Sequence, residues 1–212
     1  MPPVTTHYRR TGRRIRNGIV AFVLLAATSF GFGETSHPFA AFGLLGAILF
    51  LAGAVNLGAL WLTFRRGEEG ENLVARELCK LPEGFTVERN VVIPGAKVGD
   101  LDLVVSSPYK TFVLEVKNWA SPVYCDGDRW WIERPNGSLR RVKSPTLQVK
   151  RASNAFRKGM RNPTVVEGLV VMTGGARMSL KSPSVPVVSL KTMNAHILTA
   201  TVEELGEARM SA

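Results

Sequence analysis

The chain has 212 residues, of which 45% are hydrophobic, and a formal net charge of +10 at pH 7. Its two cysteines and three scattered histidines exclude a disulfide framework and a Cys/His zinc site. The charge is uneven: residues 67–128 hold six basic and eleven acidic side chains, whereas residues 129–161 hold ten basic and one acidic. An acidic block followed by a basic block indicates a local site rather than general affinity for polyanions.

Two uncharged apolar runs lie near the start of the chain, at residues 18–33 and 39–64. The second exceeds the roughly 20 residues that cross a bilayer, whereas the first would cross only with local thinning or snorkelling of its flanks. A signal peptide is the alternative for the first run, because a basic stretch precedes it. We favour a helical hairpin with its tip at residues 34–38, because the cleavage site is poorly defined and a longer apolar run follows at once.

Arginines flank this predicted hairpin at both ends, and its tip has no Lys or Arg. The positive-inside rule then places both ends in the cytoplasm. We expect a multi-pass membrane protein with a basic cytoplasmic tail (residues 1–16), a two-helix transmembrane hairpin (17–66) and a cytoplasmic domain (67–212). The arginines are Arg9, Arg10, Arg13, Arg14 and Arg16 before the hairpin, and Arg65 and Arg66 after it.

The remaining residues amount to about one domain. Apolar periodicity and turn signals predict, in order, a helix, three strands, a hairpin, a basic helix, two strands and a final helix. Short turns make the first three strands antiparallel, and the basic helix suggests a crossover. This order predicts an α/β or α+β domain with a mixed central sheet flanked by helices. The elements cover residues 67–81, 85–93, 100–107, 111–119, 121–137, 145–160, 165–173 and 184–190, and a helix from near Thr201.

The predicted third strand has an apolar start and a charged end, "TFVLEVKNW". Glu115 and Lys117 are two residues apart and share a face, because side chains alternate along a strand. Taken alone, such a pair is more often an exposed ion pair. Asp102, thirteen residues before Glu115 on the neighbouring strand, can meet it across one sheet face. Asp100 is the rival acid, nearer the turn.

Two acids that converge on one face repel each other unless a cation lies between them. Hard divalent cations prefer such oxygen ligands, and Mg²⁺ commonly takes only one or two carboxylates, several waters and phosphate oxygens. A lysine beside the ion would stabilise negative charge on a phosphate or help to activate water. From the residues alone, a divalent-metal site that acts on a phosphate group and an exposed cross-strand ion pair remain equal alternatives.

Four segments together resemble the nuclease-related domain (NERD) family of the PD-(D/E)XK nuclease-like superfamily: "GEEGENLVAREL", "GDLDLVV", "FVLEVKNW" and "TLQVKR". The resemblance covers about residues 67–157. It implies a restriction-endonuclease-like fold and a divalent-metal-dependent nuclease site. One position departs from the family pattern, because Leu103 stands where a histidine usually follows the aspartate.

The resemblance assigns candidate roles to individual residues. Asp102 and Glu115 would hold the metal, with the Val116 carbonyl as a third ligand. Lys117 would stabilise the phosphate or position water. Glu71 of the G-x-x-G-E pattern and Gln148 of the basic helix would orient the metal shell or water. The expected catalytic residues are thus Glu71, Asp102, Glu115, Lys117 and Gln148.

The basic block offers a second line of argument. Its side chains can follow a phosphate backbone, and the alternative is a solvated helix face near anionic lipid. The nearby tryptophans Trp119, Trp130 and Trp131 can stack on bases, or else pack in the core. The predicted nucleic-acid-binding residues are Lys143, Lys150, Arg151, Arg157 and Lys158, with Arg161 beside them.

The leading hypothesis is a membrane-anchored, divalent-metal-dependent nuclease that acts on DNA or RNA. The alternative is a non-catalytic, membrane-tethered module of the same fold that binds nucleic acid or serves as a scaffold. A third possibility is a module that contacts only lipid. Cleavage with metal, salt-dependent binding without cleavage, and binding to anionic vesicles alone would separate these three.

Overall fold

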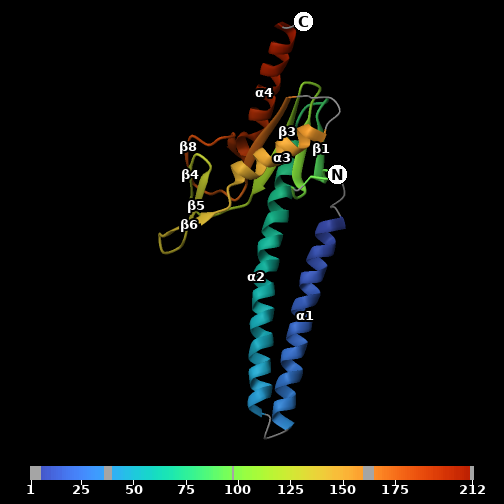
Figure 1. Cartoon of the computed structure of the whole chain (residues 1–212), viewed down its shortest axis with the longest axis vertical. Helices are drawn as coiled ribbons and strands as arrows, with labels where there is room; N and C mark the ends of the chain where they lie inside the picture. The colour runs from blue at the N-terminus through green and yellow to red at the C-terminus, as the bar shows by residue number, and fades with distance from the viewer. Residues whose placement is uncertain (1–5, 36–39, 97, 160–164, 211–212) are drawn as a thin grey trace. The chain divides into compact units, whose positions relative to one another are not determined.

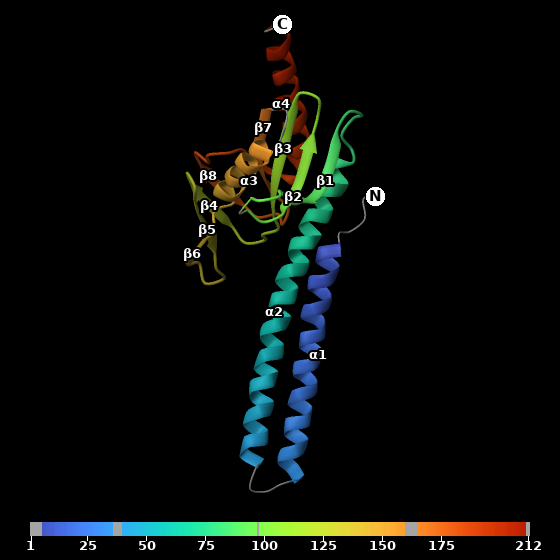
Figure 2. The ribbon, with the colours of Figure 1, turned by 45° about the vertical axis from the view of Figure 1, so that its right-hand side comes forward.

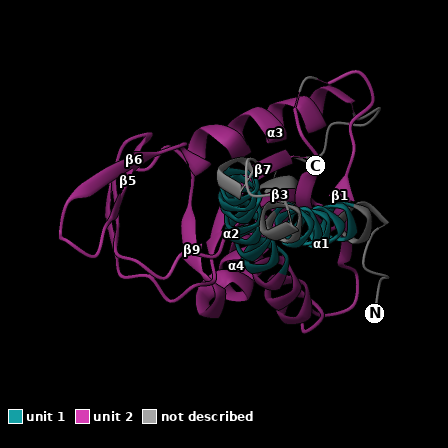
Figure 3. Cartoon of the chain, turned by 90° about the horizontal axis from the view of Figure 1, so that it is seen from below, with its two compact units in different colours: residues 1–68 teal, residues 69–212 magenta. Residues whose placement is uncertain are grey.

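The computed structural model describes residues 6–35, 40–96, 98–159 and 165–210, and the chain divides into two compact units, residues 1–68 and 69–212 (Figure 3). Residues 36–38 of the predicted tip, residue 39 of the second apolar run and Arg161 lie outside the described residues. The elements, labelled in Figure 1, are α1 (Thr6–Thr35), α2 (Ala40–Leu78), β1 (Thr86–Val91), β2 (Leu101–Ser106), β3 (Lys110–Lys117), β4 (Val123–Asp126), β5 (Arg129–Glu133), β6 (Leu139–Val142), α3 (Pro145–Gly159), β7 (Val165–Met172), β8 (Met178–Lys181), β9 (Val187–Ser189) and α4 (Leu190–Met210).

In the first unit, α1 and the first part of α2 run side by side as an antiparallel pair (Figures 1 and 2). Small residues let the helices approach closely. A Cβ atom at Gly53 would lie 2.7 Å from the Phe22 ring, and one at Gly46 would lie 3.3 Å from Ser29. The Phe22 ring also packs against Phe50 with 6.1 Å between centroids.

Among the residues that the structure describes, one helix is long and apolar enough to cross a membrane. This is the segment Gly43–Leu78 of α2, whose most apolar window has a mean hydropathy of 2.0 and is only 11% buried. The sequence predicted two transmembrane helices, and the structure corrects that number to one candidate. The first apolar run is shorter, and in α1 it continues a segment rich in arginine, which lowers the hydropathy of that helix.

The helix predicted over residues 67–81 is continuous with the second apolar helix. It forms the C-terminal part of α2 and ends at Leu78. In the second unit a five-stranded sheet has the order β1-β2-β3-β7-β9. β1, β2 and β3 pair antiparallel, whereas β3 pairs with β7 and β7 with β9 in parallel. This confirms the predicted mixed α/β sheet, because a parallel partner for β3 requires a crossover.

Helices cover both faces of this sheet. α3 packs on one face, where Val149 and Ala152 meet Val104, Val113 and Val170. It approaches β7 closely, since a Cβ atom at Gly168 would lie 2.8 Å from Ser153 Oγ. The end of α2 and the helix α4 pack on the other face; this core contains Val74, Leu78, Leu103, Val105, Phe112, Leu114, Met193 and Ile197.

A second sheet, which the sequence did not predict, has the order β6-β5-β4-β8. The predicted hairpin supplies β4 and β5, and Gly127 makes their turn with a φ of 62°. β6 and β8 were missed because each has only four residues and mixes apolar with basic side chains. The inner face of this sheet buries Val123, Cys125 and Trp130 against the α3 side of the core.

The last helix begins earlier than predicted, at Leu190 rather than near Thr201. Thr192 in its first turn reaches back to the residue before the helix: the Ser189 N–H donates to Thr192 Oγ1 at 3.2 Å, and the two hydroxyl oxygens lie 3.0 Å apart. Met193, Ile197 and Ala200 are buried at helical spacing. The period of these three residues was a signal for the earlier start.

Candidate active site

Asp102 and Glu115 meet across the β2–β3 pair. Leu103 pairs with Leu114 in the antiparallel register, and the two acids are the next residue beyond that pair on each strand. The N–H of Val116 donates to Asp102 Oδ2 at 2.8 Å. Alternation with Val104 and Val113, which pack against α3, puts both acids on the α3 face of the sheet.

A cavity of about 290 Å³ lies between this face and α3. Asp102 and Glu115 line it from the sheet, and Gln148 and Arg151 line it from the helix. Ser144 caps α3 by accepting a hydrogen bond from the Leu147 N–H at 3.2 Å, which fixes the turn that carries Gln148. Three of the predicted catalytic residues thus line one cavity, together with an arginine.

The Asp102 carboxyl is strongly perturbed. Burial raises its pKa from 3.8 to about 7, and the negative charges of Glu115 and Glu71 add to the effect. The Val116 N–H and the Lys117 ammonium lower the pKa but do not offset these causes. The site therefore has more negative charge at Asp102 than its own donors stabilise, which a bound cation would relieve.

Lys117 and Glu115 form an ion pair within β3. Their side chains are only 20% and 15% exposed, respectively, so the pair is not the solvated surface bridge that the E-x-K pattern alone would indicate. Asp100, the rival acid, is exposed and also lines the cavity. The side chain at position 103 is buried in the opposite core, on the other face of the sheet from Asp102.

Glu71 is held near the site by the close approach of α2. A Cβ atom at Gly70 would lie 2.9 Å from both Asn118 Cβ and Thr173 Oγ1, so any larger residue would force a shift where α2 meets the ends of β3 and β7. A Cβ atom at Gly67 would meet nothing within 4 Å. The second glycine of the G-x-x-G-E pattern therefore has a packing reason that the first lacks.

Arg89 of β1 was not predicted as part of this region. Its Nη2 lies 4.0 Å from Glu71 Oε2 and donates to Asn72 Oδ1 at 2.9 Å. It pairs with Leu103 across β1 and β2, on the face of the sheet that is otherwise apolar. An arginine among apolar residues of one strand face was the signal in the sequence.

The oxygens at the cavity suit a hard divalent cation. Among the described residues no group of three or more His, Cys, Asp and Glu could hold a metal ion. Mg²⁺ needs fewer protein ligands, because it keeps several waters and takes one or two carboxylates. The Val116 N–H is bonded to Asp102, and its carbonyl stays a prediction as a third ligand. Asp102 and Glu115, which both line the cavity, make a donor set that fits.

The predicted nucleic-acid-binding residues differ in whether they reach the cavity or another charged group. Arg151 lines the cavity, and Lys150 Nζ lies 3.9 Å from Asp128 Oδ2 in the β4–β5 turn. The others are exposed and do not line the cavity: Lys143, Arg157 and Lys158. Only Arg151 thus combines the basic helix with the acidic site.

The three tryptophans have different surroundings. Trp130 is fully buried, its Nε1 donates to Thr146 Oγ1 at 3.1 Å, and it packs edge-on against Trp119 with 6.3 Å between centroids. The stacking interpretation is therefore wrong for Trp130, which belongs to the core. Trp131 lies on the opposite face of the small sheet, with the Arg129 guanidinium carbon 5.9 Å from its ring.

Comparison with known proteins agrees with this arrangement. The family described as nuclease-related domain (NERD) matches residues 66–173, which include the acids, Lys117, Gln148 and Arg151. No curated protein and no solved structure matches the chain. The match covers half of the sequence and every element that lines the cavity, so the chain belongs to the nuclease-related domain family.

Proposed function

We propose that the protein is a membrane-anchored, divalent-metal-dependent nuclease that hydrolyses phosphodiester bonds of DNA or RNA. The observation that carries the proposal is the cavity where Asp102 and Glu115 face Gln148 and Arg151, with the pKa of Asp102 raised to about 7. Strongly shifted carboxyl groups in a cavity are typical of functional sites.

Each polar group has a role in this proposal. Asp102 and Glu115, with the Val116 carbonyl, would hold Mg²⁺ or Mn²⁺, which when bound acts as a Lewis acid and lowers the pKa of a water ligand. Lys117 releases Glu115 for this role and turns its charge towards a phosphate oxygen. Arg151 binds the phosphate group, and Gln148 orients water by hydrogen bonding. Glu71 positions the acids from α2.

Membrane anchoring through α2 is the second part of the proposal. The large apolar side chains on the first unit are unusually exposed; Leu24, Leu49 and Val55, for example, are 61%, 63% and 67% exposed. Apolar surface of this kind needs a covering partner, and a lipid bilayer fits the apolar part of α2, whose 18-residue window has a mean hydropathy of 2.0. The flanking arginines favour a cytoplasmic nuclease domain.

The test uses the full chain in neutral detergent with labelled single- and double-stranded DNA and RNA. We expect cleavage in Mg²⁺ or Mn²⁺, none in a chelator, and a loss on the order of 10³-fold in Asp102→Asn and Glu115→Gln, because several kcal/mol of charge stabilisation disappears. Glu203→Gln, the same change on the exposed surface of α4, serves as the matched control. Cleavage that persists in both site variants would rule out this site.

A non-catalytic nucleic-acid-binding module is the second candidate, and the small sheet favours it. Tyr124, Trp131 and Arg141 are register partners across β4, β5 and β6, and they share the face opposite the core. A row of two aromatic rings and an arginine suits stacking on unpaired bases beside a phosphate backbone. Arg129 adds a second positive charge over Trp131.

Binding without metal distinguishes this candidate from the nuclease. Trp131→Ala should weaken binding of single-stranded nucleic acid about tenfold, as stacking of one base contributes about 1–3 kcal/mol. Tyr109→Ala, an exposed aromatic in the β2–β3 turn, is the control. Fluorescence anisotropy across a salt series reads both variants, and steeply salt-dependent binding without metal-dependent cleavage would favour the binding module.

A further inference from the structure

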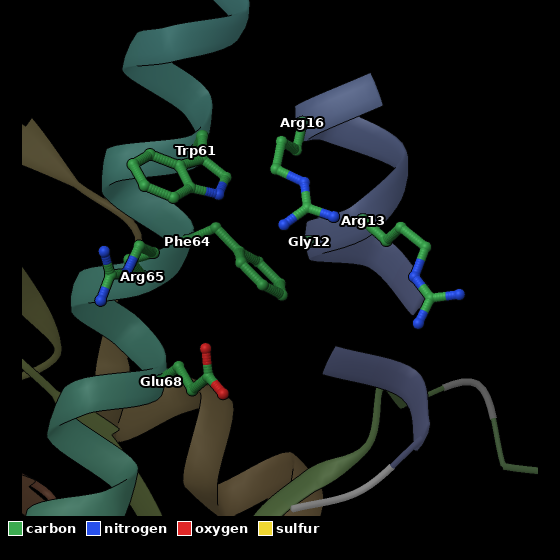
Figure 4. Close-up of a pocket in the computed structure, with 7 residues that line it drawn as sticks. All are labelled: Gly12, Arg13, Arg16, Trp61, Phe64, Arg65 and Glu68. Atoms are coloured by element: carbon green, nitrogen blue, oxygen red, sulfur yellow. The ribbon is translucent and has the colours of Figure 1, made fainter. Parts of the chain in front are cut away.

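A second cavity, of about 430 Å³, lies within the first unit between α1 and α2 (Figure 4). Its lining joins basic and aromatic side chains with one acid: Arg13 and Arg16 come from α1, and Trp61, Phe64, Arg65 and Glu68 come from α2. None of these residues belongs to the NERD match except Glu68, and none lines the nuclease cavity. The cavity is therefore a candidate binding site of its own.

Gly12 lines this space from α1. A Cβ atom at Gly12 would lie 3.5 Å from Phe64, whose ring points towards α1 in Figure 4. Arg16 lies on the side of α1 that faces α2. On α2, Arg65 stacks over Trp61 with its guanidinium carbon 5.0 Å from the ring centroid. Aromatic surface and guanidinium groups thus line one cavity.

The charge of the lining selects an anion. Three arginines and one glutamate leave two net positive charges, and the three arginines are exposed. A guanidinium group binds phosphate oxygens through two parallel hydrogen bonds. Cavities of this size accept a ligand the size of a lipid head group. The chemistry points to a phosphate group.

The surroundings indicate that the phosphate carries an apolar tail. The cavity lies at the end of the apolar stretch of the hairpin, where the exposed side chains Val20, Leu60 and Leu62 begin. Tryptophan and arginine at the end of an apolar helix are typical of the level of lipid head groups. Basic pockets between membrane helices bind anionic head groups on the cytoplasmic side.

We propose that the cavity between α1 and α2 binds the phosphate group of an anionic phospholipid, with Arg16 as its main ligand and Arg13 and Arg65 at its sides. The proposal rests on the membrane association described under the proposed function, but not on nuclease activity. Trp61 and Phe64 supply the apolar wall against which the glycerol backbone and the start of the acyl chains pack.

The test measures lipid retention on the delipidated full chain in neutral detergent by native mass spectrometry. Phosphatidylglycerol, phosphatidylcholine and soluble glycerol 3-phosphate are the three probes. We expect one phosphatidylglycerol to bind at least tenfold more tightly than either of the others. Arg16→Gln should weaken this binding about tenfold, because a hydrogen bond between charged groups contributes about that factor. Arg14→Gln, two residues away and outside the lining, should leave it unchanged.

Three outcomes would overturn the proposal. Equal affinity for the two lipids removes the anion preference. Equal loss in Arg14→Gln and Arg16→Gln shows diffuse attraction to basic helices rather than a site. Equal affinity for glycerol 3-phosphate assigns the cavity to a free phosphate ester.

Flotation with phosphatidylcholine vesicles separates the two proposals. A chain that floats but shows no lipid preference contradicts only the cavity proposal. A chain that does not float with vesicles of either lipid contradicts the anchoring and the cavity together. Asp102→Asn, which removes the proposed nuclease site, should bind phosphatidylglycerol as the unchanged chain does.

Discussion

Strand β3 has buried charges at both ends, and the two ends differ in how those charges are balanced. At its start, Lys110 Nζ lies 2.7 Å from Glu167 Oε2 and 3.9 Å from Glu204 Oε2. His196 Nε2 lies 3.0 Å from the other oxygen of Glu167. Each acid at this end therefore has a cationic or hydrogen-bonding partner on another element.

At the end of β3 the strongest charge neighbour of Asp102 is another acid. Glu115 and Glu71 both raise the pKa of Asp102, and Lys117 offsets only part of their effect. A cavity opens beside these acids. The comparison separates a network that satisfies its own charges, and so holds α4 to the sheet, from a set of acids that a cation would complete.

The largest expected effect comes from breaking the balanced end. Lys110→Met leaves Glu167 and Glu204 without their ammonium partner, and removing one member of a buried pair costs about 3 kcal/mol in the free energy of unfolding. Urea denaturation of the full chain, followed through the tryptophans of the second unit, measures the change. Nuclease activity per folded molecule should stay the same, because Lys110 lies at the other end of the strand.

A matched double variant checks this interpretation. Lys110→Met with Glu167→Gln removes both charges of the 2.7 Å pair, and it should recover part of the lost stability, since the remaining neutral groups cost less to bury. Equal destabilisation in the single and double variants would contradict a charge-based origin. It would instead indicate that the ammonium acts through Phe112, whose ring centroid lies 5.6 Å from Nζ.

The unbalanced end should make stability depend on pH in the opposite sense to an ordinary paired aspartate. Folding raises the pKa of Asp102 from 3.8 to about 7, so the folded state keeps a proton that the unfolded state releases between these values. The free energy of unfolding therefore falls as the pH rises from 4 to 7. The expected loss is about 2 kcal/mol, because solvent screening reduces the stability change that the whole pKa shift would otherwise give.

Asp102→Asn should flatten that pH dependence, whereas Asp100→Asn, on the exposed rival acid, should keep it. Mg²⁺ should raise the unfolding midpoint of the unchanged chain more at pH 8 than at pH 5, because a cation competes with the proton for the same carboxylate. Unfolding midpoints measured over this pH range, with and without Mg²⁺, test both expectations. An unchanged pH slope in Asp102→Asn would show that another group causes it.

Much of the central sheet could be predicted from alternation and short turns. The polar end of β3 and the acid of β2 lay at positions that an antiparallel pair brings together, so Asp102 and Glu115 followed from register alone. The cap at Ser144 fixed the start of α3 and, with it, the place of Gln148. Local sequence patterns of this kind therefore predict how elements that are neighbours in the sequence pair and where they begin.

Other features depend on contacts between distant segments and left weaker signals. β8 pairs with β4 across more than fifty residues of sequence, and neither strand alone specifies that partner. Arg89 and Arg151 reach the acidic region from β1 and α3, and their spacing in the sequence does not show it. The two apolar runs illustrate the converse, since both were evident in the sequence, but among the described residues α2 alone is long and apolar enough to span a membrane.

The smallest expected effect concerns the glycine that brings α2 to the end of β3. Gly70→Ala puts a methyl group 2.9 Å from Asn118 and Thr173, and overpacking of this kind costs about 1–3 kcal/mol, partly offset by about 1 kcal/mol of helix propensity. We expect a net loss of about 1 kcal/mol. Gly67→Ala, where a methyl group meets nothing within 4 Å, should gain helix propensity without the clash and is the matched control. If the clash moves α2, and Glu71 with it, away from Asp102, Gly70→Ala also lowers the pKa of Asp102. The pH range over which stability is lost then moves to lower pH. A pH profile that does not move would show that Glu71 stays in place and that Asn118 absorbs the clash.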